Sequence, residues 1–165
     1  MKAGLVASVG PMAAVAGAIA EHVGKGLVAA GAEEVIVENG GDIYLSRSCD
    51  CTVAVFSGES PLSNRVGIRL KSERMPTGIC TSSGTVGHSL SFGDADSVTV
   101  VACSTALADA AATSIGNVVG GCRSPRDAIA RSLEKAEEIT GLDGILVICD
   151  DLMGAAGEIE IMPLE

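Results

Sequence analysis

The fold is decided by the stretch Ser97-Val98-Thr99-Val100-Val101-Ala102-Cys103 and by the segment that follows it, Thr105-Ala106-Leu107-Ala108-Asp109-Ala110-Ala111-Ala112-Thr113. β-Branched residues dominate the first part, and turn residues at 92–96 precede it, so it is predicted to be a buried strand. The small residues of the second part predict a helix from Thr105 to about Val119. Its alanines would let another backbone come close.

A polar stripe runs along this predicted helix. Asp109, Thr113 and Asn117 are spaced i, i+4, i+8 and therefore share one face. In one interpretation, Asp109 lies in the first turn and favours the helix dipole, while the Thr113 hydroxyl bonds to a carbonyl one turn earlier. In the other, Asp109 and Thr113 supply two oxygen ligands to a hard cation such as Mg²⁺, which completes its shell with water and substrate phosphates. Spacing alone leaves both open.

Composition sets the class of protein. A chain of 165 residues predicts a single domain, residues 1–165, and 47% hydrophobic with only 2% aromatic residues predicts a core of Val, Ile, Leu and Ala. The formal net charge of -10 and the scattered basic residues count against nucleic acid and anionic membranes as partners. The six cysteines are interpreted as reduced cytosolic thiols, with Cys103 and Cys149 buried in apolar strands.

The first thirty residues resemble a signal peptide, but Pro11 and several glycines interrupt the apolar stretch, so we expect it to belong to the core. Leu5 to Val9 predicts a strand, and Met12 to about Ala30 a helix that Gly31 ends. Glycines in that helix cost up to about 1 kcal/mol each relative to alanine. Something is therefore expected to pack very near it, while His22 faces solvent.

The next segments predict strands and turns. Strands are expected at 34–38, 43–45, 51–56, 65–70, 144–149 and 158–162, and Asn39-Gly40-Gly41-Asp42 is expected to form a hairpin turn. Ser124-Pro125 starts a helix that Gly141 ends. Strands in hairpin-like clusters between a few helices favour an α+β class, with antiparallel or mixed sheet packed in layers with helices.

A hydroxyl- and glycine-rich loop is predicted from Thr81 to Ser89. Its residues Thr81, Ser82, Ser83, Gly84 and Thr85 could turn N–H groups toward a phosphate or carboxylate, or the loop could simply be solvated. His88, near several hydroxyls and Cys80, is a candidate base. Sequence proximity does not establish contact, so binding is favoured over catalysis for this loop.

Three segments carry a family resemblance: Gly40-Gly41-Asp42, Thr81-Ser82-Ser83-Gly84 and Ala108-Asp109-Ala110-Ala111-Ala112-Thr113. In this order they resemble the blocks of the ApbE-like (FAD:protein FMN transferase) superfamily. From Gly10-Pro11-Met12-Ala13-Ala14-Val15 nearly to the C-terminus, the chain most resembles an uncharacterised cytosolic branch of it.

The resemblance implies an activity and a site. ApbE-like enzymes bind FAD with Mg²⁺ and move FMN onto a threonine or serine hydroxyl, releasing AMP. It implies Asp109 and Thr113 as metal ligands and places Gly41 and Asp42 beside the flavin nucleotide, although an ordinary hairpin turn would equally explain Gly41 and Asp42.

Three departures from the family pattern put transfer in doubt. Val15-Ala16-Gly17 stands where the family has Ala-Lys-Gly, so the lysine is missing. His88-Ser89-Leu90-Ser91-Phe92-Gly93 keeps the His of the family loop and loses its Asp. The amino-terminal portion that often contributes to the flavin pocket is short or absent.

Two functions of different class remain open. One is a Mg²⁺-dependent flavin transferase or FAD pyrophosphate-cleaving enzyme, with His88 as base. The other is a non-transferase protein that binds a phosphorylated or other small anion and acts with a partner, with a role in cytosolic sulfur assimilation as a weaker variant. A homodimer in the cytoplasm is expected in either case.

Overall fold

The computed structural model describes residues 2–84 and 95–165. Within them the strands form two sheets, of order β1-β2-β5-β6-β7-β8 and β3-β4-β9, and every strand pair is antiparallel. The first sheet consists of β1 (Val35–Asn39), β2 (Asp42–Ser46), β5 (Thr77–Ser82), β6 (Ser97–Ala102), β7 (Gly144–Cys149) and β8 (Leu152–Gly157). The second consists of β3 (Cys51–Ala54), β4 (Val66–Leu70) and β9 (Glu160–Pro163). The α+β class is confirmed.

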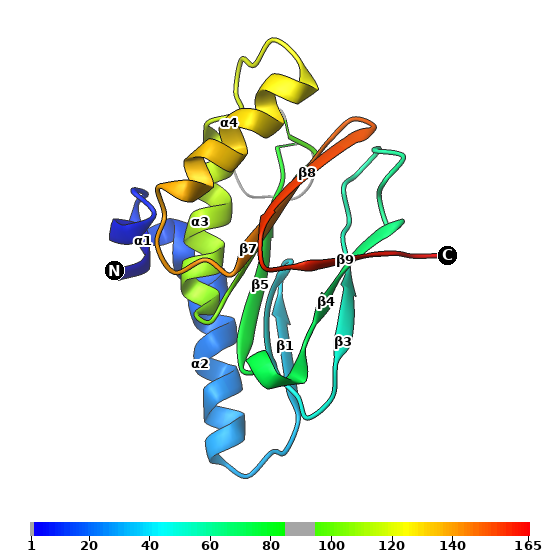
Figure 1. Ribbon diagram of the computed structural model, residues 1–165. Coiled ribbons are helices and arrows are strands. Elements are labelled where there is room, and N and C mark those ends of the chain that lie inside the picture. The colour runs from blue at the N-terminus through cyan, green and yellow to red at the C-terminus, as the bar shows by residue number, and fades with distance from the viewer. Residues whose placement is uncertain (1, 85–94) are drawn as a thin grey trace.

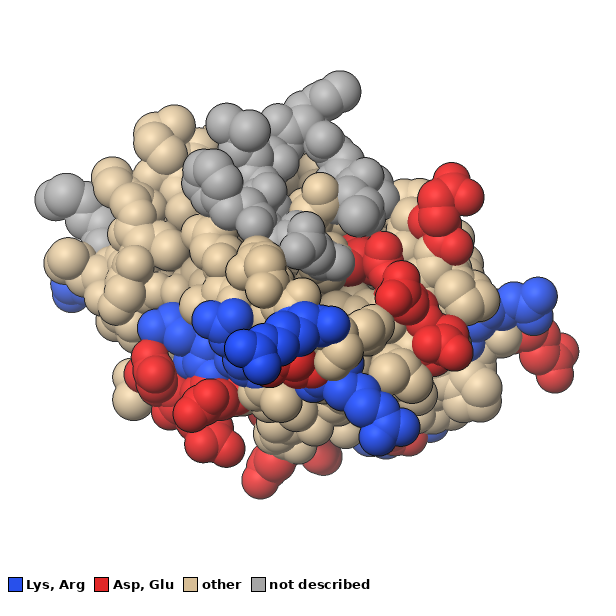
Figure 2. Space-filling view, turned by 90° about the horizontal axis from the view of Figure 1, so that it is seen from above, with Lys and Arg blue, Asp and Glu red and all other residues tan. Residues whose placement is uncertain are grey.

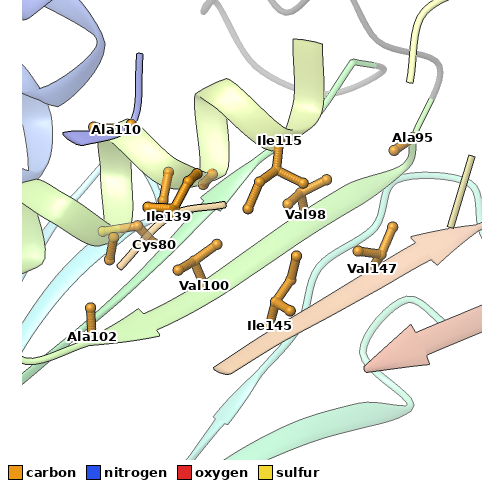
Figure 3. Close-up of a cluster of buried hydrophobic side chains, with 14 of the residues drawn as sticks. Cys80, Ala95, Val98, Val100, Ala102, Ala110, Ile115, Ile139, Ile145 and Val147 are labelled. Carbon is orange, nitrogen blue, oxygen red and sulfur yellow. The ribbon is translucent and has the colours of Figure 1, made fainter. Parts of the chain in front are cut away.

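Helices cover one face of the six-stranded sheet, and the three-stranded sheet covers part of the other (Figure 1). The helices are α1 (Lys2–Val6), α2 (Val15–Ala29), α3 (Thr105–Asn117) and α4 (Pro125–Glu137), with short 3₁₀ turns at Pro11–Ala14 and Ser72–Arg74. Side chains alternate along the central strands. Val98, Val100, Ile145 and Val147 point to the helices (Figure 3), whereas Val101, Leu146 and Ile148 pack toward the smaller sheet.

Most predicted elements are confirmed, strand β8 was not predicted, and three predictions for other segments are wrong. Leu5 to Val9 is not a strand, because α1 occupies residues 2–6 and Ser8 adopts a positive φ of 58°. Thr81 and Ser82 do not begin a loop. They end β5, which pairs with β2 and β6. Cys103 is exposed because it lies just beyond the end of β6, whereas Cys149 is buried as expected.

Helices α2 and α3 cap one another. Asp109 Oδ2 of α3 accepts the Gly17 N–H of α2 at 2.8 Å, and Glu21 Oε2 of α2 accepts the Ala106 N–H of α3 at 3.1 Å. Both amides belong to first turns, whose N–H groups lack partners within the helix. Ser104 also caps α3 through the Leu107 N–H, whereas Ala14 offers α2 no side-chain cap. Asp109 of α3 therefore provides a side-chain cap to α2, whose own N-cap residue provides none.

Glycines allow α2 to lie this close, as the sequence predicts. A Cβ at Gly17 would stand 2.6 Å from the Thr105 carbonyl oxygen, and one at Gly24 would stand 2.0 Å from the Tyr44 ring. Both glycines are buried. Since no real Cβ approaches so closely, either substitution would push α2 away from α3 or β2.

One helical stretch of the described residues, Pro11–Ala29, is long and apolar enough to cross a membrane by length and composition. It lies near the N-terminus, and 22% of it is buried. A core helix or a signal sequence can pass the same test, so this finding alone assigns no membrane role.

Candidate functional site

A cleft of about 440 Å³ lies where the β1–β2 turn, the end of β3, the ends of β5 and β6, and α3 come together. It brings together seven of the residues that the sequence predicts to form a site, namely Gly41, Asp42, Thr81, Ser82, Ser83, Asp109 and Thr113. Gly84 does not line it, and its N–H donates to the Ala95 carbonyl at 3.1 Å. Thr85 and His88 lie outside the described residues. The roles of all of these residues remain predictions.

The β1–β2 turn has the expected hairpin geometry. Asn39 pairs with Asp42, and the two residues between them, Gly40 and Gly41, have positive φ values of 66° and 99°. This is the arrangement that two-residue hairpins favour. The Glu38 carboxylate accepts the Gly41 N–H at 3.0 Å, and the Asn39 amide donates to the Ala16 carbonyl of α2 at 3.2 Å. The turn therefore holds Asp42 in a fixed position beside α2.

Asp42 is the most perturbed carboxyl of the cleft. Its side chain is 8% exposed, and its strand partner in β5 is Cys80. Burial and, to a smaller extent, the charge of Asp109 together raise the pKa of Asp42 from 3.8 to about 7, against a hydrogen bond with Cys80 that lowers it. Near neutral pH this carboxyl is therefore divided between its acid and its carboxylate form.

Asp109 is the second carboxyl. It is the fifth residue of α3 and so lies beyond the first turn, contrary to the dipole interpretation, and it caps α2 instead. Burial raises its pKa, and the Gly17 N–H opposes that shift. Because Oδ2 accepts the Gly17 N–H, Oδ1 is the oxygen that is available to bind a ligand in the cleft.

Hydroxyl groups form the rest of the polar wall. Thr81 and Thr99 project from neighbouring strands, and their Oγ1 atoms lie 3.0 Å apart. Ser82, Ser83 and Thr113 add three more hydroxyls to the lining. No Lys or Arg from residues 2–84 and 95–165 lines the cleft. A phosphate bound there would therefore need backbone N–H groups or a metal ion to balance its charge.

The donor set fits a hard cation. Asp42 and Asp109 lie close enough for the charge of one to raise the pKa of the other, and a cation between them would favour both carboxylates. Thr113 adds a neutral oxygen. The described residues contain no cluster of three His, Cys, Asp or Glu side chains that could hold a metal ion. Mg²⁺ would thus depend on water and on ligand phosphates for most of its shell, as it commonly does.

An apolar wall of the cleft was not predicted. Ile43, Val53, Val55 and Ile79 line it, together with Phe56, whose side chain is 53% exposed. The sequence contains only two phenylalanines. In the sequence, the signal that could have revealed this wall was Phe56, an aromatic residue directly before the loop that begins at Ser57-Gly58. Such a side chain can pack against a planar ring.

The surface charge is mixed. Figure 2 shows Lys and Arg side chains in a band with Asp and Glu side chains on either side of it. At one end of the strands of the smaller sheet, Arg69 and Lys71 each pair with both Asp50 and Glu160. The surface therefore does not present a uniformly negative potential, although the formal net charge is -10. Selection of an anionic ligand must come from the groups that line the cleft.

Comparison with known proteins agrees with the fold. The family model described as "AbpE bacteria" matches residues 1–160. A UPF0280 protein of Methanococcus vannielii is 52% identical over 155 residues, which are 93% of this chain and 62% of the relative. The UPF0280 protein of Methanocaldococcus jannaschii is 51% identical over 159 residues, which are 95% of this chain and 64% of the relative. The chain thus spans less than two thirds of these relatives.

Two solved structures share the fold at low identity. The apo form of the Pseudomonas stutzeri flavinyl transferase ApbE superposes with a TM-score of 0.56 at 18% identity, covering 87% of this chain and 47% of that protein. The ApbE protein of Thermotoga maritima superposes with a TM-score of 0.51 at 18% identity, covering 76% of this chain and 43% of that one. At this identity the similarity concerns the fold alone.

Proposed function

Because the chain belongs to the family described as AbpE bacteria, we propose that its cleft binds a flavin nucleotide together with Mg²⁺ and that it acts on the pyrophosphate of FAD. The observation that carries the proposal is that Asp42 and Asp109 meet in one cleft with several hydroxyls and an apolar wall that includes Phe56. The solved structure of a flavinyl transferase with the same fold supports it.

Each group has a role in this proposal. Asp109 and Thr113 hold the cation, which neutralises the pyrophosphate when bound. Gly41 and the hydroxyls of Thr81, Ser82 and Ser83 bind polar groups of the ligand. Phe56 and the apolar wall pack against a ring of the nucleotide.

The reaction needs one proton acceptor. The hydroxyl oxygen of an acceptor serine or threonine attacks the phosphorus of the FMN half, the bond from that phosphorus to the bridging oxygen breaks, and AMP leaves with that oxygen. The hydroxyl proton passes to a base. Asp42 is suited to this role because it lies in the cleft, and a cation beside it would favour the carboxylate form that accepts the proton. His88, predicted as the base from sequence, stays a second candidate.

One observation favours a binding protein without transfer. Asp109 already uses one carboxylate oxygen to cap α2, and Val15-Ala16-Gly17 lacks the family lysine beside that cap. A weakened cation site could retain a phosphorylated ligand without cleaving it. The chain would then act as a carrier or partner protein, and the suggested role in sulfur assimilation would fall under this alternative.

The test is a titration of the purified protein with FAD, with and without Mg²⁺, followed by flavin fluorescence and by assay of released AMP. We expect binding that requires Mg²⁺ and AMP release that increases when a threonine-containing acceptor is added. Binding without AMP release under every condition would favour the carrier. Absence of binding with and without Mg²⁺ would refute both flavin proposals.

Two variants test the proposed cation site. Asp109→Asn keeps an oxygen that can accept the Gly17 N–H but removes the charge, and Thr113→Val removes one hydroxyl. Both should weaken Mg²⁺-dependent binding by about tenfold or more, which is about 1.4 kcal/mol. Asp151→Asn, which removes a charge from an exposed turn, is the matched control. An equal loss in all three variants would contradict the assignment.

A further inference from the structure

Helix α2 turns its small side chains inward. Gly17, Ala20 and Gly24 are its buried residues, and they allow close contact with α3 and Tyr44. The side that packs on the protein therefore contains no large apolar residue. This is the reverse of an ordinary surface helix, in which the large apolar stripe faces the core.

Large apolar side chains of α1, of the 3₁₀ turn at Pro11–Ala14 and of one flank of α2 point outward instead. Between 38% and 79% of each residue is exposed, and we call them together the α1–α2 apolar face: Leu5, Val6, Met12, Val15, Ile19, Val23 and Leu27. They are seven of the eleven large hydrophobic residues exposed in the described part of the chain. In Figure 1 this side carries the N-terminus. Monomeric proteins seldom leave a patch of this kind uncovered.

The size of the face matches a protein–protein interface. Its seven residues expose on the order of 700 Å² together, against roughly 800 Å² per partner in a standard interface. A contact limited to one or two side chains would leave most of the face in water. The partner must therefore be a surface that is similarly broad and apolar.

The shape of the face suits a copy of itself. Val15, Ile19, Val23 and Leu27 follow each other at i, i+4 intervals and form one ridge along α2. The next i, i+4 row consists of Ala18, His22 and Gly26, which are all exposed, and a Cβ at Gly26 would meet nothing within 4 Å, so this row is shallow on either side of His22. Ridges of this i±4n kind fit into one another when two helices cross at about 50°. A twofold axis would bring the same patch of both copies together.

The charges beside the ridge disfavour a membrane. Glu21 and Lys25 form an i, i+4 ion pair, and the whole chain has a formal net charge of -10. Helices that lie on anionic membranes carry Lys and Arg along their polar side. A second copy imposes no such requirement, because the neutral Glu21–Lys25 pair stays at the rim.

We propose that the α1–α2 apolar face is the interface of a twofold-symmetric homodimer of this chain, with the α2 helices of the two copies in contact. The proposal does not depend on the flavin proposal, since none of the seven residues lines the cleft. It gives the dimer expected from the sequence a defined surface.

The test is size-exclusion chromatography with light scattering from about 1 to 100 µM. We expect a species of twice the 16.5 kDa chain mass. Ile19→Glu combined with Val23→Glu should raise the dissociation constant at least 100-fold, because each copy would bury two unpaired charges. The matched control is Ile36→Glu combined with Met153→Glu, at exposed apolar positions outside the face, which should remain dimeric. Circular dichroism checks that all variants fold.

Three results would overturn the proposal. The first is a wild-type monomer over the whole range, and the second is a dimer that the Ile19 and Val23 changes leave intact. The third is a monomer that binds another occupant through this face. Two probes test for another occupant. One is anionic phospholipid vesicles, and the other is the part of the Methanococcus vannielii relative outside its matched residues, added as a separate polypeptide. Binding of either probe that the double Glu variant abolishes would assign the face to that probe.

Discussion

Replacement of Asp42 by asparagine tests the electrostatics of the cleft without the need for a substrate. The folded state raises the pKa of Asp42 from 3.8 to about 7. Between these values the unfolded chain has already released the proton that the folded chain retains. The free energy of unfolding must therefore fall as pH rises from about 4 to about 7, and it should change no further above that range on account of this group.

The size of the effect follows from the shift. Each pH unit across the window costs about 1.4 kcal/mol, so between about pH 5 and about pH 8 the wild type should lose on the order of 2 to 3 kcal/mol through Asp42. Asparagine has no proton to lose. The stability of Asp42→Asn relative to the wild type should therefore increase by that amount over the same interval.

The assay is urea unfolding of both proteins at the two pH values, with Asp151→Asn as the control for the change in net charge. The change in unfolding free energy on addition of Mg²⁺ provides a second measurement. If the ion is held beside Asp42 and Asp109, it should stabilise the wild type at about pH 8 by about 2.7 kcal/mol at 100 times its dissociation constant. The same addition should do less for Asp42→Asn. A stability difference between wild type and variant that is equal at both pH values would refute the reasoning.

Three further substitutions address the helices and the apolar wall. Gly17→Ala should destabilise the protein by about 1 to 3 kcal/mol in urea unfolding, because its Cβ would lie against Thr105 and Asp109. Gly26→Ala, on the open side of α2, should be neutral or slightly stabilising. Equal losses of stability in the two variants would contradict the described packing of α2. Glu21→Gln should lower the melting temperature by an amount equivalent to about 1 kcal/mol, since a charged cap on the first turn of α3 becomes neutral; Lys25→Met leaves that cap in place and should have a smaller effect. Phe56→Ala should weaken flavin binding by about tenfold with little change in melting temperature, because its side chain is half exposed; an unchanged dissociation constant would remove Phe56 from the binding wall.

The regular elements could be predicted because their signals are local. Ser124-Pro125 marks the start of α4, Asn39-Gly40-Gly41-Asp42 marks a hairpin, and the β-branched run of β6 has few alternatives. The errors arise where tertiary pairing overrides composition. β8 consists largely of Gly and Ala, residues that are poor signals of a strand, and it exists because it pairs with β7. The composition of Thr81 and Ser82 matches that of the loop after them, and only their pairing with Thr99 and Val98 of β6 makes them part of a strand.

The cleft was partly predictable for the same reason. The spacing of Asp109 and Thr113 on one helix face is a property of the chain, and both do line the cleft. Neither the contact of Asp109 with Gly17 nor its influence on Asp42 is visible in the sequence, because those residues lie far apart along it. The outward orientation of Ile19 and Val23 was equally hidden. Only the packing of Gly17 and Gly24 reveals which side of α2 faces inward.

The hydrogen bond from Gly17 to Asp109 joins positions 92 residues apart. Exchange of the Gly17 amide proton with solvent requires this bond to open, and while it is open Asp109 Oδ2 has lost its partner in α2. Protection of this backbone proton therefore reports the free energy needed to open the contact between Gly17 and Asp109. A ligand that binds the Asp109 carboxylate should slow hydrogen exchange at the Gly17 amide without contacting Gly17. The exchange rate of this one amide in the first turn of α2 would then report whether the cleft is occupied.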